Sequence, residues 1–376
     1  MQNSKHEWPA SLIARVQAGA DGAISFRDFM DACLYDEQFG YYNRDTVKIG
    51  KEGDFYTSAS IGPFMGMMLA ECCLRLRQEE GWGGERWQIV EWGGGTGRLA
   101  VQVLDHLQAA APEAYETINY VLVDGSAYHR VSQQKQLERH ASIIRTCSPE
   151  EWLRQPSSIA IPTIVCSNEL LDAFPVHRLR YKNGRFEELH VAWDETKGAF
   201  QDRYIPLTEE PSHTELQRYI EEERLPRRED QLFEVNLAIG PWLSQIRARM
   251  NRGAIITIDY GDVREELYAS HRMQGTLLCY YRHRAYDNPY VHVGEQDMTA
   301  HVNFSAVIRY GEQLGISRWK LQTQREFLIE HGILERLQEH DGADPFGAAA
   351  RNNRAIRQLL WSDQMSELFK VLVQLI

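Results

Sequence analysis

A glycine-rich stretch at residues 88–100 constrains the fold of this chain more than any other feature. It opens with apolar residues that suit a buried strand, continues with Gly93, Gly95 and Gly97, and ends in residues 98–107, which have a helical pattern. A strand, a glycine turn and a helix in this order place backbone N–H groups where they can face a ligand. Because glycine has no Cβ, a ligand can also approach the backbone closely. The stretch therefore predicts a site for a nucleotide-like cofactor.

Two cofactors fit this turn. Residues 95–100 match the dinucleotide fingerprint G-x-G-x-x-G/A, so NAD is one of them. Counted from Gly93, the spacing is instead G-x-G-x-G, and Glu91 stands two residues before it. That arrangement resembles the first motif of class I methyltransferases that use S-adenosylmethionine, a cofactor whose sulfonium and ammonium favour a nearby acid. A tight turn that binds no ligand is the structural alternative.

From residue 87 onward the pattern alternates between strand and helix, which predicts a parallel sheet of the Rossmann-like α/β type. Polar side chains stand where four of the expected strands end. In open α/β sheets, ligands bind beyond the carboxyl ends of the strands, so these side chains are expected to line one crevice. They are Glu91, Asp124, Asn168 with Glu169, and Asp259.

Other segments have clear local patterns. Residues 8–38 read as helical, and residues 61–76 predict a methionine-rich helix that packs in the core. Residues 178–193 predict a hairpin, and residues 232–250 predict a helix. The charge-dense residues 218–230 predict a solvated surface.

Composition narrows the classes of function. The net charge of −12 argues against nucleic acid bound on a broad basic surface. The six cysteines form no C-x-x-C pair, so we expect reduced thiols and no metal site. We see no signal or transit peptide and no run of the roughly 20 apolar residues that a membrane span needs. These features predict a cytoplasmic bacterial protein.

Several blocks resemble the MidA-like family, whose animal members are mitochondrial methyltransferases that assist assembly of respiratory complex I. The most specific are residues 167–175 (Ser-Asn-Glu-Leu-Leu-Asp-Ala-Phe-Pro) and residues 294–304 (Gly-Glu-Gln-Asp-Met-Thr-Ala-His-Val-Asn-Phe). Residues 39–42 (Phe-Gly-Tyr-Tyr), residues 53–58 (Gly-Asp-Phe-Tyr-Thr-Ser) and the glycine turn also match. The blocks follow the family's order over nearly the whole chain.

The resemblance implies a class I methyltransferase fold with S-adenosylmethionine as cofactor. We expect an N-terminal helical region with a closing loop at residues 1–85, and a methyltransferase domain at residues 86–376 with insertions at about 176–230 and 262–304. The resemblance further implies symmetric methylation of arginine on a protein, the known family target being a complex I subunit. A homodimer is a further expectation.

The sequence departs from the family in two places. The family usually has proline at Gly94, and Pro-Glu where this chain has Ala59 and Ser60. The missing acid weakens the transfer of the family's substrate to this chain. It does not affect the transfer of the cofactor.

The fold implies roles for the cofactor-binding residues. Gly93, Gly95 and Gly97 would lie against the methionine part, Asp124 would accept hydrogen bonds from the ribose hydroxyls, and Ser126 would lie near the adenine. The expected set is completed by Glu91, Asn168, Thr57 and Ser58.

An arginine acceptor needs carboxylates, because its guanidinium is always protonated and a poor nucleophile. Glu169 is the first candidate, since it ends a strand that faces the crevice. Asp54, Glu295 and Asp297 are further candidates, and a helix cap or a surface ion pair is the alternative role for each.

Three other functions stay open at this point. One is methylation of a small molecule or of another protein side chain. The second is a non-catalytic assembly factor for a respiratory complex, which keeps the fold and binds a partner. The third is an NAD-dependent oxidoreductase, which the dinucleotide fingerprint also fits.

Overall fold

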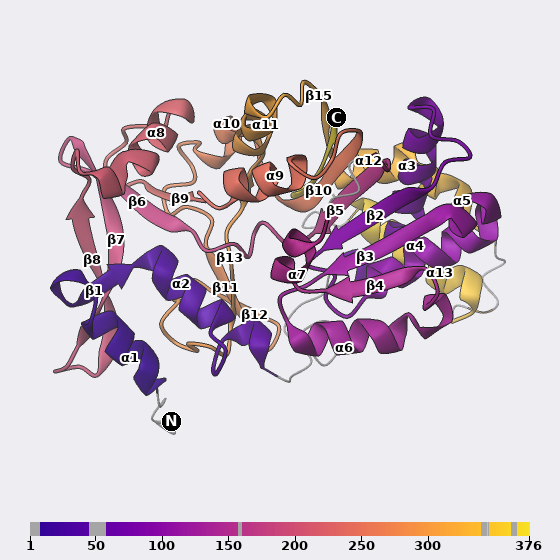
Figure 1. Cartoon of the computed structure of the whole chain (residues 1–376). Helices are drawn as coiled ribbons and strands as arrows, with labels where there is room; N and C mark the ends of the chain where they lie inside the picture. The colour runs from indigo at the N-terminus through magenta and orange to yellow at the C-terminus, as the bar shows by residue number, and fades with distance from the viewer. Residues whose placement is uncertain (1–7, 45–57, 157–159, 340–343, 345, 362–366) are drawn as a thin grey trace.

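The computed structural model describes residues 8–44, 58–156, 160–339, 344, 346–361 and 367–376 (Figure 1). Its largest element is an eight-stranded sheet in the order β15-β16-β10-β5-β2-β3-β4, with β14 paired to the end of β10. The strands are β2 (Trp87–Trp92), β3 (Ile118–Val123), β4 (Ile144–Cys147), β5 (Thr163–Asn168), β10 (Gly253–Asp262), β14 (Val302–Asn303), β15 (Arg318–Thr323) and β16 (Phe369–Leu375).

The direction of winding changes in the middle of this sheet. Strands β4, β3, β2, β5 and β10 are parallel to one another, and β16 runs antiparallel to both β10 and β15. The chain builds from β2 outward to β3 and β4, and then returns to β5 on the other side of β2. Ligand crevices of open α/β sheets lie at such a switch point. The sheet confirms the predicted Rossmann-like α/β class.

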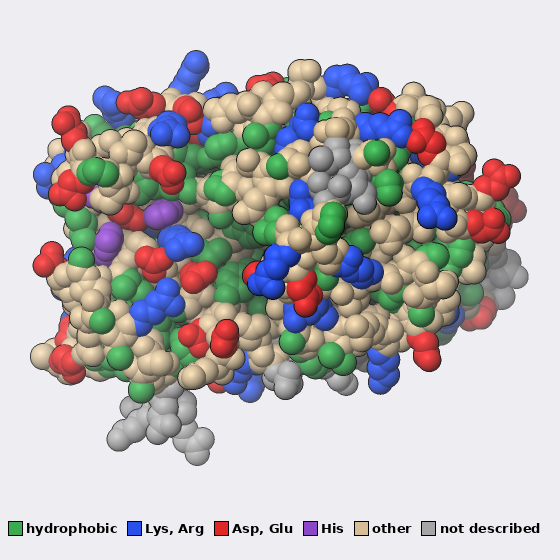
Figure 2. Space-filling view, viewed as in Figure 1, with side chains coloured by type: hydrophobic (Ala, Val, Ile, Leu, Met, Phe, Trp, Pro, Cys, Tyr) green, Lys and Arg blue, Asp and Glu red, His purple; other side chains and the backbone are tan. Residues whose placement is uncertain are grey.

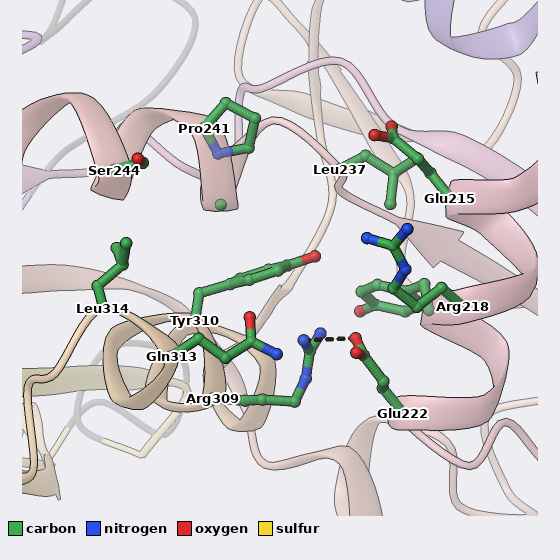
Figure 3. Close-up of a pocket in the computed structure, with 12 residues that line it drawn as sticks. Glu215, Arg218, Glu222, Leu237, Pro241, Ser244, Arg309, Tyr310, Gln313 and Leu314 are labelled. Atoms are coloured by element: carbon green, nitrogen blue, oxygen red, sulfur yellow. Dashed lines mark ion pairs between the residues drawn. The ribbon is translucent and has the colours of Figure 1, made fainter.

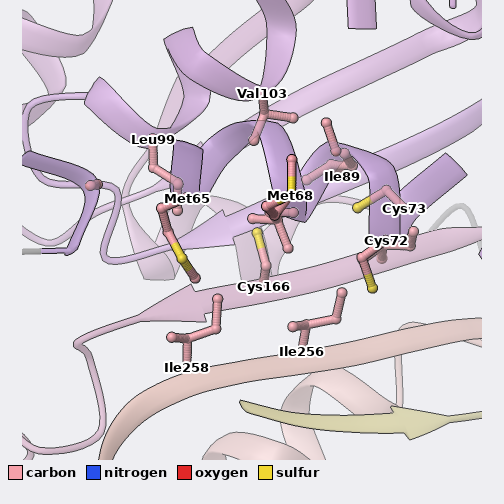
Figure 4. Close-up of a cluster of buried hydrophobic side chains, with 14 of the residues drawn as sticks. Met65, Met68, Cys72, Cys73, Ile89, Leu99, Val103, Cys166, Ile256 and Ile258 are labelled. Atoms are coloured by element: carbon pink, nitrogen blue, oxygen red, sulfur yellow. The ribbon is translucent and has the colours of Figure 1, made fainter. Parts of the chain in front are cut away.

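Helices cover both faces of the sheet. One apolar cluster packs α3 (Phe64–Glu79), α4 (Arg98–Ala110), α12 (Gln324–Glu330) and α13 (Ala348–Trp361) against one face. A second cluster packs α7 (Pro149–Arg154), α9 (Ile239–Arg247) and α11 (Phe304–Gln313) against the other. Met65 and Met68 of α3 are fully buried beside Ile256 and Cys166 of the sheet (Figure 4). The methionines are core residues, as predicted.

A second, antiparallel sheet joins segments that are far apart in the sequence. Its strands are β1 (Ala23–Ser25), β6 (His177–Lys182), β7 (Arg185–Asp194), β8 (Ala199–Pro206) and β9 (Leu232–Val235). The predicted hairpin is confirmed: β6 and β7 are joined at Asn183 and Gly184, which have positive φ angles of 50° and 82°. Helices α1 (Ala10–Gln17) and α2 (Phe26–Tyr35) pack in one apolar cluster with β7 and with a small third sheet, made of β11 (Leu278–Tyr281), β12 (Arg284–Tyr286) and β13 (Asp297–Thr299).

Two predicted elements are wrong in part. Residues 232–250 were expected to form one helix, but Leu232–Val235 is the strand β9 and the helix begins only at Ile239. Phe233 pairs with Leu179 of β6, and both side chains are buried. The segment at residues 8–38 is also interrupted, because β1 pairs with β7. In both cases a partner strand distant in sequence overrides the local helical pattern.

Composition predicted no broad basic surface for nucleic acid and no membrane span. On the face shown in Figure 2, basic and acidic side chains are intermixed. Among the described helices, none is long and apolar enough to cross a membrane. Nucleic-acid binding and cellular location stay predictions from the sequence.

Candidate functional site

A cleft of about 920 Å³ lies at the carboxyl ends of β2, β3 and β5. The glycine turn and the loops after β3 and β5 form one wall, and α2 with residues 37–43 forms the other. In Figure 1 the arrowheads of β2, β3 and β4 point toward the side on which α2 lies. The cleft thus sits at the switch point of the sheet, where the strand-end acids were expected to converge.

The glycine turn needs its glycines. Gly93, Gly95 and Gly97 have φ angles of 69°, 51° and 86°, a backbone region that residues with a Cβ rarely adopt. A Cβ at Gly93 would also lie 2.8 Å from Cδ1 of Leu170. Gly97 precedes the first residue of α4, so the turn presents the helix N-terminus to the cleft.

Asp124 ties the loop after β3 to the glycine turn. Its carboxylate accepts hydrogen bonds from the backbone N–H of Gly95 at 3.0 Å and of Ser126 at 2.9 Å, and lies 3.3 Å from Nδ1 of His129. Ser126 in turn caps α6 (Ala127–Gln136). Asp124 and Ser126 both line the cleft, so the structure brings them to the glycine turn as predicted from the strand ends.

Glu91 is a buried acid in the cleft wall. Its side chain accepts a hydrogen bond of 2.6 Å from the hydroxyl of Tyr120, and the residue is only 3% exposed. Burial raises the pKa of Glu91 to about 7. The carboxyl group therefore changes charge near neutral pH.

Glu169 occupies a strained turn at the end of β5. Its φ angle of 53° is unusual for a residue with a Cβ. Its N–H donates to the carbonyl of Ile258 at 2.9 Å, and Asn168 donates from Nδ2 to Oε1 of Glu169 at 3.1 Å. Asn168 and Glu169 both line the cleft.

Asp259, near the end of β10, stabilises this turn by hydrogen bonds. Its Oδ2 accepts hydrogen bonds from the backbone N–H of Leu170 at 3.1 Å and of Leu171 at 2.8 Å. The residue is fully buried and is not among the residues that line the cleft. The sequence placed Asp259 in the crevice, whereas the structure gives it a role in fixing the turn that carries Glu169.

The other acids proposed for catalysis lie elsewhere. Asp297 is buried and accepts a hydrogen bond of 2.9 Å from the hydroxyl of Tyr42, which does line the cleft. Glu295 lies 3.5 Å from the guanidinium of Arg44, and neither residue lines the cleft. Their catalytic roles stay predictions.

Part of the predicted site cannot be placed. Asp54 and Thr57 lie outside the described residues, and Ser58 begins a short 3-10 helix, Ser58–Ser60. Sequence reasoning gave no role to several residues of the second wall, although the Phe-Gly-Tyr-Tyr block marked its neighbourhood. They are Asp31, Tyr35, Glu37, Tyr42 and Asn43.

A second, smaller pocket of about 290 Å³ lies between α8 (Thr214–Glu222), α9 and α11 (Figure 3). Arg309 reaches across it, pairs with Glu222, and donates from Nε to Glu223 at 2.7 Å. The prediction of a solvated charge run is wrong for Glu223, which is 1% exposed. Within the described chain, no group of three or more His, Cys, Asp or Glu side chains is arranged to hold a metal ion.

Comparison with known proteins identifies the family of this chain. A sequence profile for S-adenosyl-L-methionine-dependent methyltransferases matches residues 68–321. The chain belongs to this family. A crystal structure of a Burkholderia thailandensis protein bound to S-adenosylhomocysteine superposes with a TM-score of 0.85 at 31% identity, over 98% of this chain and 91% of that one. The class I fold and the resemblance to MidA-like proteins are confirmed.

Curated relatives from animals agree with this family. The Drosophila melanogaster protein arginine methyltransferase NDUFAF7 homolog is 26% identical over 85% of this chain and 77% of its own length. The Bos taurus protein arginine methyltransferase NDUFAF7 is 25% identical over 87% of this chain and 73% of its own length. Both are described as mitochondrial.

The residues of the cleft fit S-adenosylmethionine. The backbone of Gly93, Gly94 and Gly95 lines the cleft without side chains, so a ligand can lie against it. Asp124 supplies a carboxylate that can accept from vicinal hydroxyls, and Glu91 supplies one suited to a cation. The cleft volume of about 920 Å³ lies at the upper end of the roughly 300–1,000 Å³ range of ligand pockets.

Affinity for S-adenosylmethionine is expected to depend on pH through Glu91. Because its pKa is about 7, the group is mostly neutral at pH 6 and mostly charged at pH 8. The carboxylate attracts the positive cofactor, so calorimetry should show binding tightening by up to about tenfold from pH 6 to pH 8.

The matched variant is Glu91→Gln, which can still accept the hydrogen bond from Tyr120. In this variant the affinity should not rise between pH 6 and pH 8. Any rise that remains comes from ionisation of the cofactor itself and can be subtracted from the wild-type value. An equal increase in both proteins would contradict the role given to Glu91.

Proposed function

We propose that this methyltransferase acts on arginine side chains of a protein. The observation that carries the proposal is the charge of the cleft, whose described lining holds six carboxylate residues and one arginine, Arg98. A wall of this sign favours a cationic acceptor. The six are Asp31, Glu37, Glu91, Asp124, Glu150 and Glu169.

In this proposal Glu169 acts on the acceptor. When bound, the cofactor supplies a methyl group on a sulfonium, ready for transfer to a nucleophile placed in line. Glu169 holds the guanidinium by charge-assisted hydrogen bonds and accepts the proton that the nitrogen loses on methylation. Asn168 and Asp259 fix the turn that presents the carboxylate.

The animal relatives are named protein arginine methyltransferases, which supports arginine as the acceptor. For the acceptor protein we propose a respiratory complex I-type subunit, as the resemblance implies. We also propose that the N-terminal region, residues 1–85, and the insertions at about 176–230 and 262–304 select that protein, while the rest of residues 86–376 holds the cofactor.

Labelling identifies the acceptor. Protein incubated with S-adenosylmethionine carrying a radioactive methyl group and a bacterial lysate is expected to label a few proteins, and acid hydrolysis should return the label in methylarginine. The labelled amino acid reports the number and symmetry of the methyl groups, and mass spectrometry names the protein.

Other outcomes separate the alternatives. Label in free metabolites or in another amino acid would contradict arginine as the acceptor and favour the small-molecule or other side-chain reaction. Failure to bind S-adenosylmethionine in calorimetry would favour a non-catalytic assembly factor.

A further inference from the structure

Two tyrosines stack on the wall of the cleft that faces the sheet. Tyr35 ends α2, and Tyr42 follows it in the Phe-Gly-Tyr-Tyr block. Their ring centroids lie 5.4 Å apart with an interplanar angle of 20°. Both line the cleft, and Tyr35 is 37% exposed although it is a large aromatic residue. The proposed reaction at Glu169 uses neither ring.

Both hydroxyl groups are anchored by hydrogen bonds, one to the segment after β5 and the other to the first residue of β13. The hydroxyl of Tyr35 donates to the carbonyl of Ala173 at 2.9 Å, four residues beyond Glu169. The hydroxyl of Tyr42 donates to Oδ1 of the buried Asp297 at 2.9 Å. Burial and the Asp297 carboxylate raise the pKa of Tyr42 well above 10, so its hydroxyl keeps the proton that it donates. The rings are therefore held in place before any ligand binds.

The connection between the two tyrosines is also fixed. Asn43 donates from Nδ2 to the carbonyl of Tyr35 at 2.8 Å and to that of Asp36 at 3.3 Å, which satisfies carbonyl groups at the end of α2. A fixed aromatic wall loses little entropy when a ligand binds to it.

The charge beside the rings indicates the kind of ligand. Asp31 and Glu37 line the same wall, and Glu37 is exposed. Because the two hydroxyls already donate within the protein, the ring faces are what the pair offers to a ligand. Aromatic faces flanked by carboxylates attract cations, and a planar guanidinium can both stack and pair with a carboxylate.

We propose that the Tyr35–Tyr42 pair is the subsite that receives the acceptor guanidinium and holds it across the cleft from Glu169. The proposal rests on arginine as the substrate. It gives the N-terminal segment a binding role: the sheet holds the cofactor, and α2 with the Phe-Gly-Tyr-Tyr block holds the acceptor side chain. Glu37, which is exposed, then attracts further positive charge on the acceptor protein, whereas Asp31 already lies 3.8 Å from the guanidinium of Arg15.

A binding experiment tests the subsite without turnover. The probes are acetyl-arginine N-methylamide and the corresponding citrulline compound, which has nearly the same shape but no charge. Calorimetry on protein saturated with S-adenosylhomocysteine is expected to show the arginine probe binding about tenfold more tightly than the citrulline probe. Tyr35→Ala and Tyr42→Ala should lower that preference to about twofold, the share that Glu169 still contributes.

Three variants of Tyr35 distinguish a role of the ring in guanidinium binding from a role in folding. Tyr35→Phe keeps the ring and should keep the preference to within about threefold of the wild type, whereas Tyr35→Leu keeps apolar bulk and should lower the preference as much as Tyr35→Ala does. Affinity for S-adenosylhomocysteine should change less than about twofold in every variant, which reports an intact cofactor site. With a labelled acceptor protein, Tyr35→Ala should raise KM and leave kcat nearly unchanged.

The failures are distinguishable. If the wild type prefers the arginine probe and the alanine variants keep that preference, the tyrosine subsite is wrong and arginine remains the acceptor. If the wild type shows no preference, the subsite is also wrong. Label recovered in an amino acid other than arginine would overturn the proposed function itself.

Discussion

Replacing Glu169 by Gln is expected to lower the rate of methyl transfer by about 10²- to 10⁴-fold, the range typical of losing a general base. Affinity for S-adenosylmethionine should stay within about threefold of the wild type, because the glycine turn and Asp124 are untouched. Single-turnover assays with saturating cofactor, together with calorimetry, measure the two quantities separately.

The backbone at Glu169 explains why its side chain is the one expected to act. A left-handed φ of 53° strains a residue with a Cβ by roughly 1–3 kcal/mol, and glycine would adopt it freely. The turn is held by the hydrogen bonds from Leu170 and Leu171 to Asp259 and by the bond from Glu169 N–H to Ile258. The fold thus maintains a strained backbone that directs a carboxylate into the cleft, which is common at functional sites.

The control is Glu116→Gln, an exposed glutamate on α5 (Pro112–Thr117), which should leave the rate unchanged. Glu169→Gln can still accept the hydrogen bond from Asn168, so a collapsed turn would not explain lost activity. Single-turnover rates within threefold of the wild type in Glu169→Gln would show that another group accepts the proton.

The cofactor half of the site was predictable from the sequence because local patterns determine it. Gly93, Gly95 and Gly97 mark a turn that only glycine can form. The alternation of strand and helix then places Glu91, Asp124 and Glu169 at one edge of a parallel sheet. In the structure Gly93, Gly95, Glu91, Asp124 and Glu169 line one cleft.

The opposite wall, which we propose binds the acceptor, could not be predicted in this way. Tyr35 reaches the cleft because α2 packs in a cluster with β7, β11 and β13, and β1, just before α2, pairs residue by residue with β7 (Ala23 with Ala192). Neither contact leaves a periodic signal in the segment itself, since each depends on a partner far away in the chain. For the same reason the sequence predicted a helix at Leu232–Val235, which in the structure is a strand because it pairs with β6.

The burial of Glu223 could not be predicted either, because it depends on partners far away in the chain. Replacing this residue is expected to have the largest effect on stability. Its side chain has no exposed area, accepts from Arg309 Nε at 2.7 Å and Asn303 Nδ2 at 2.9 Å, and lies 3.9 Å from Arg264. Asn303 also caps α11 and donates to the hydroxyl of Tyr219 in α8 at 3.0 Å. These contacts join the inserted helix α8 to the helix layer of the large sheet.

Glu223→Ala is therefore expected to lower the free energy of unfolding by about 2–4 kcal/mol, because the buried amide of Asn303 loses one acceptor and the half-buried Arg309 keeps only Glu222 as a carboxylate partner. Urea denaturation measures the change, and Glu223→Gln should show a smaller loss, since it keeps one acceptor for Asn303. The matched control, Glu221→Ala, removes an exposed charge two residues earlier and should change stability by less than about 0.5 kcal/mol. Equal losses in Glu221→Ala and Glu223→Ala would mean that the charge run acts through net charge alone, and that the buried network does not hold α8 to the sheet.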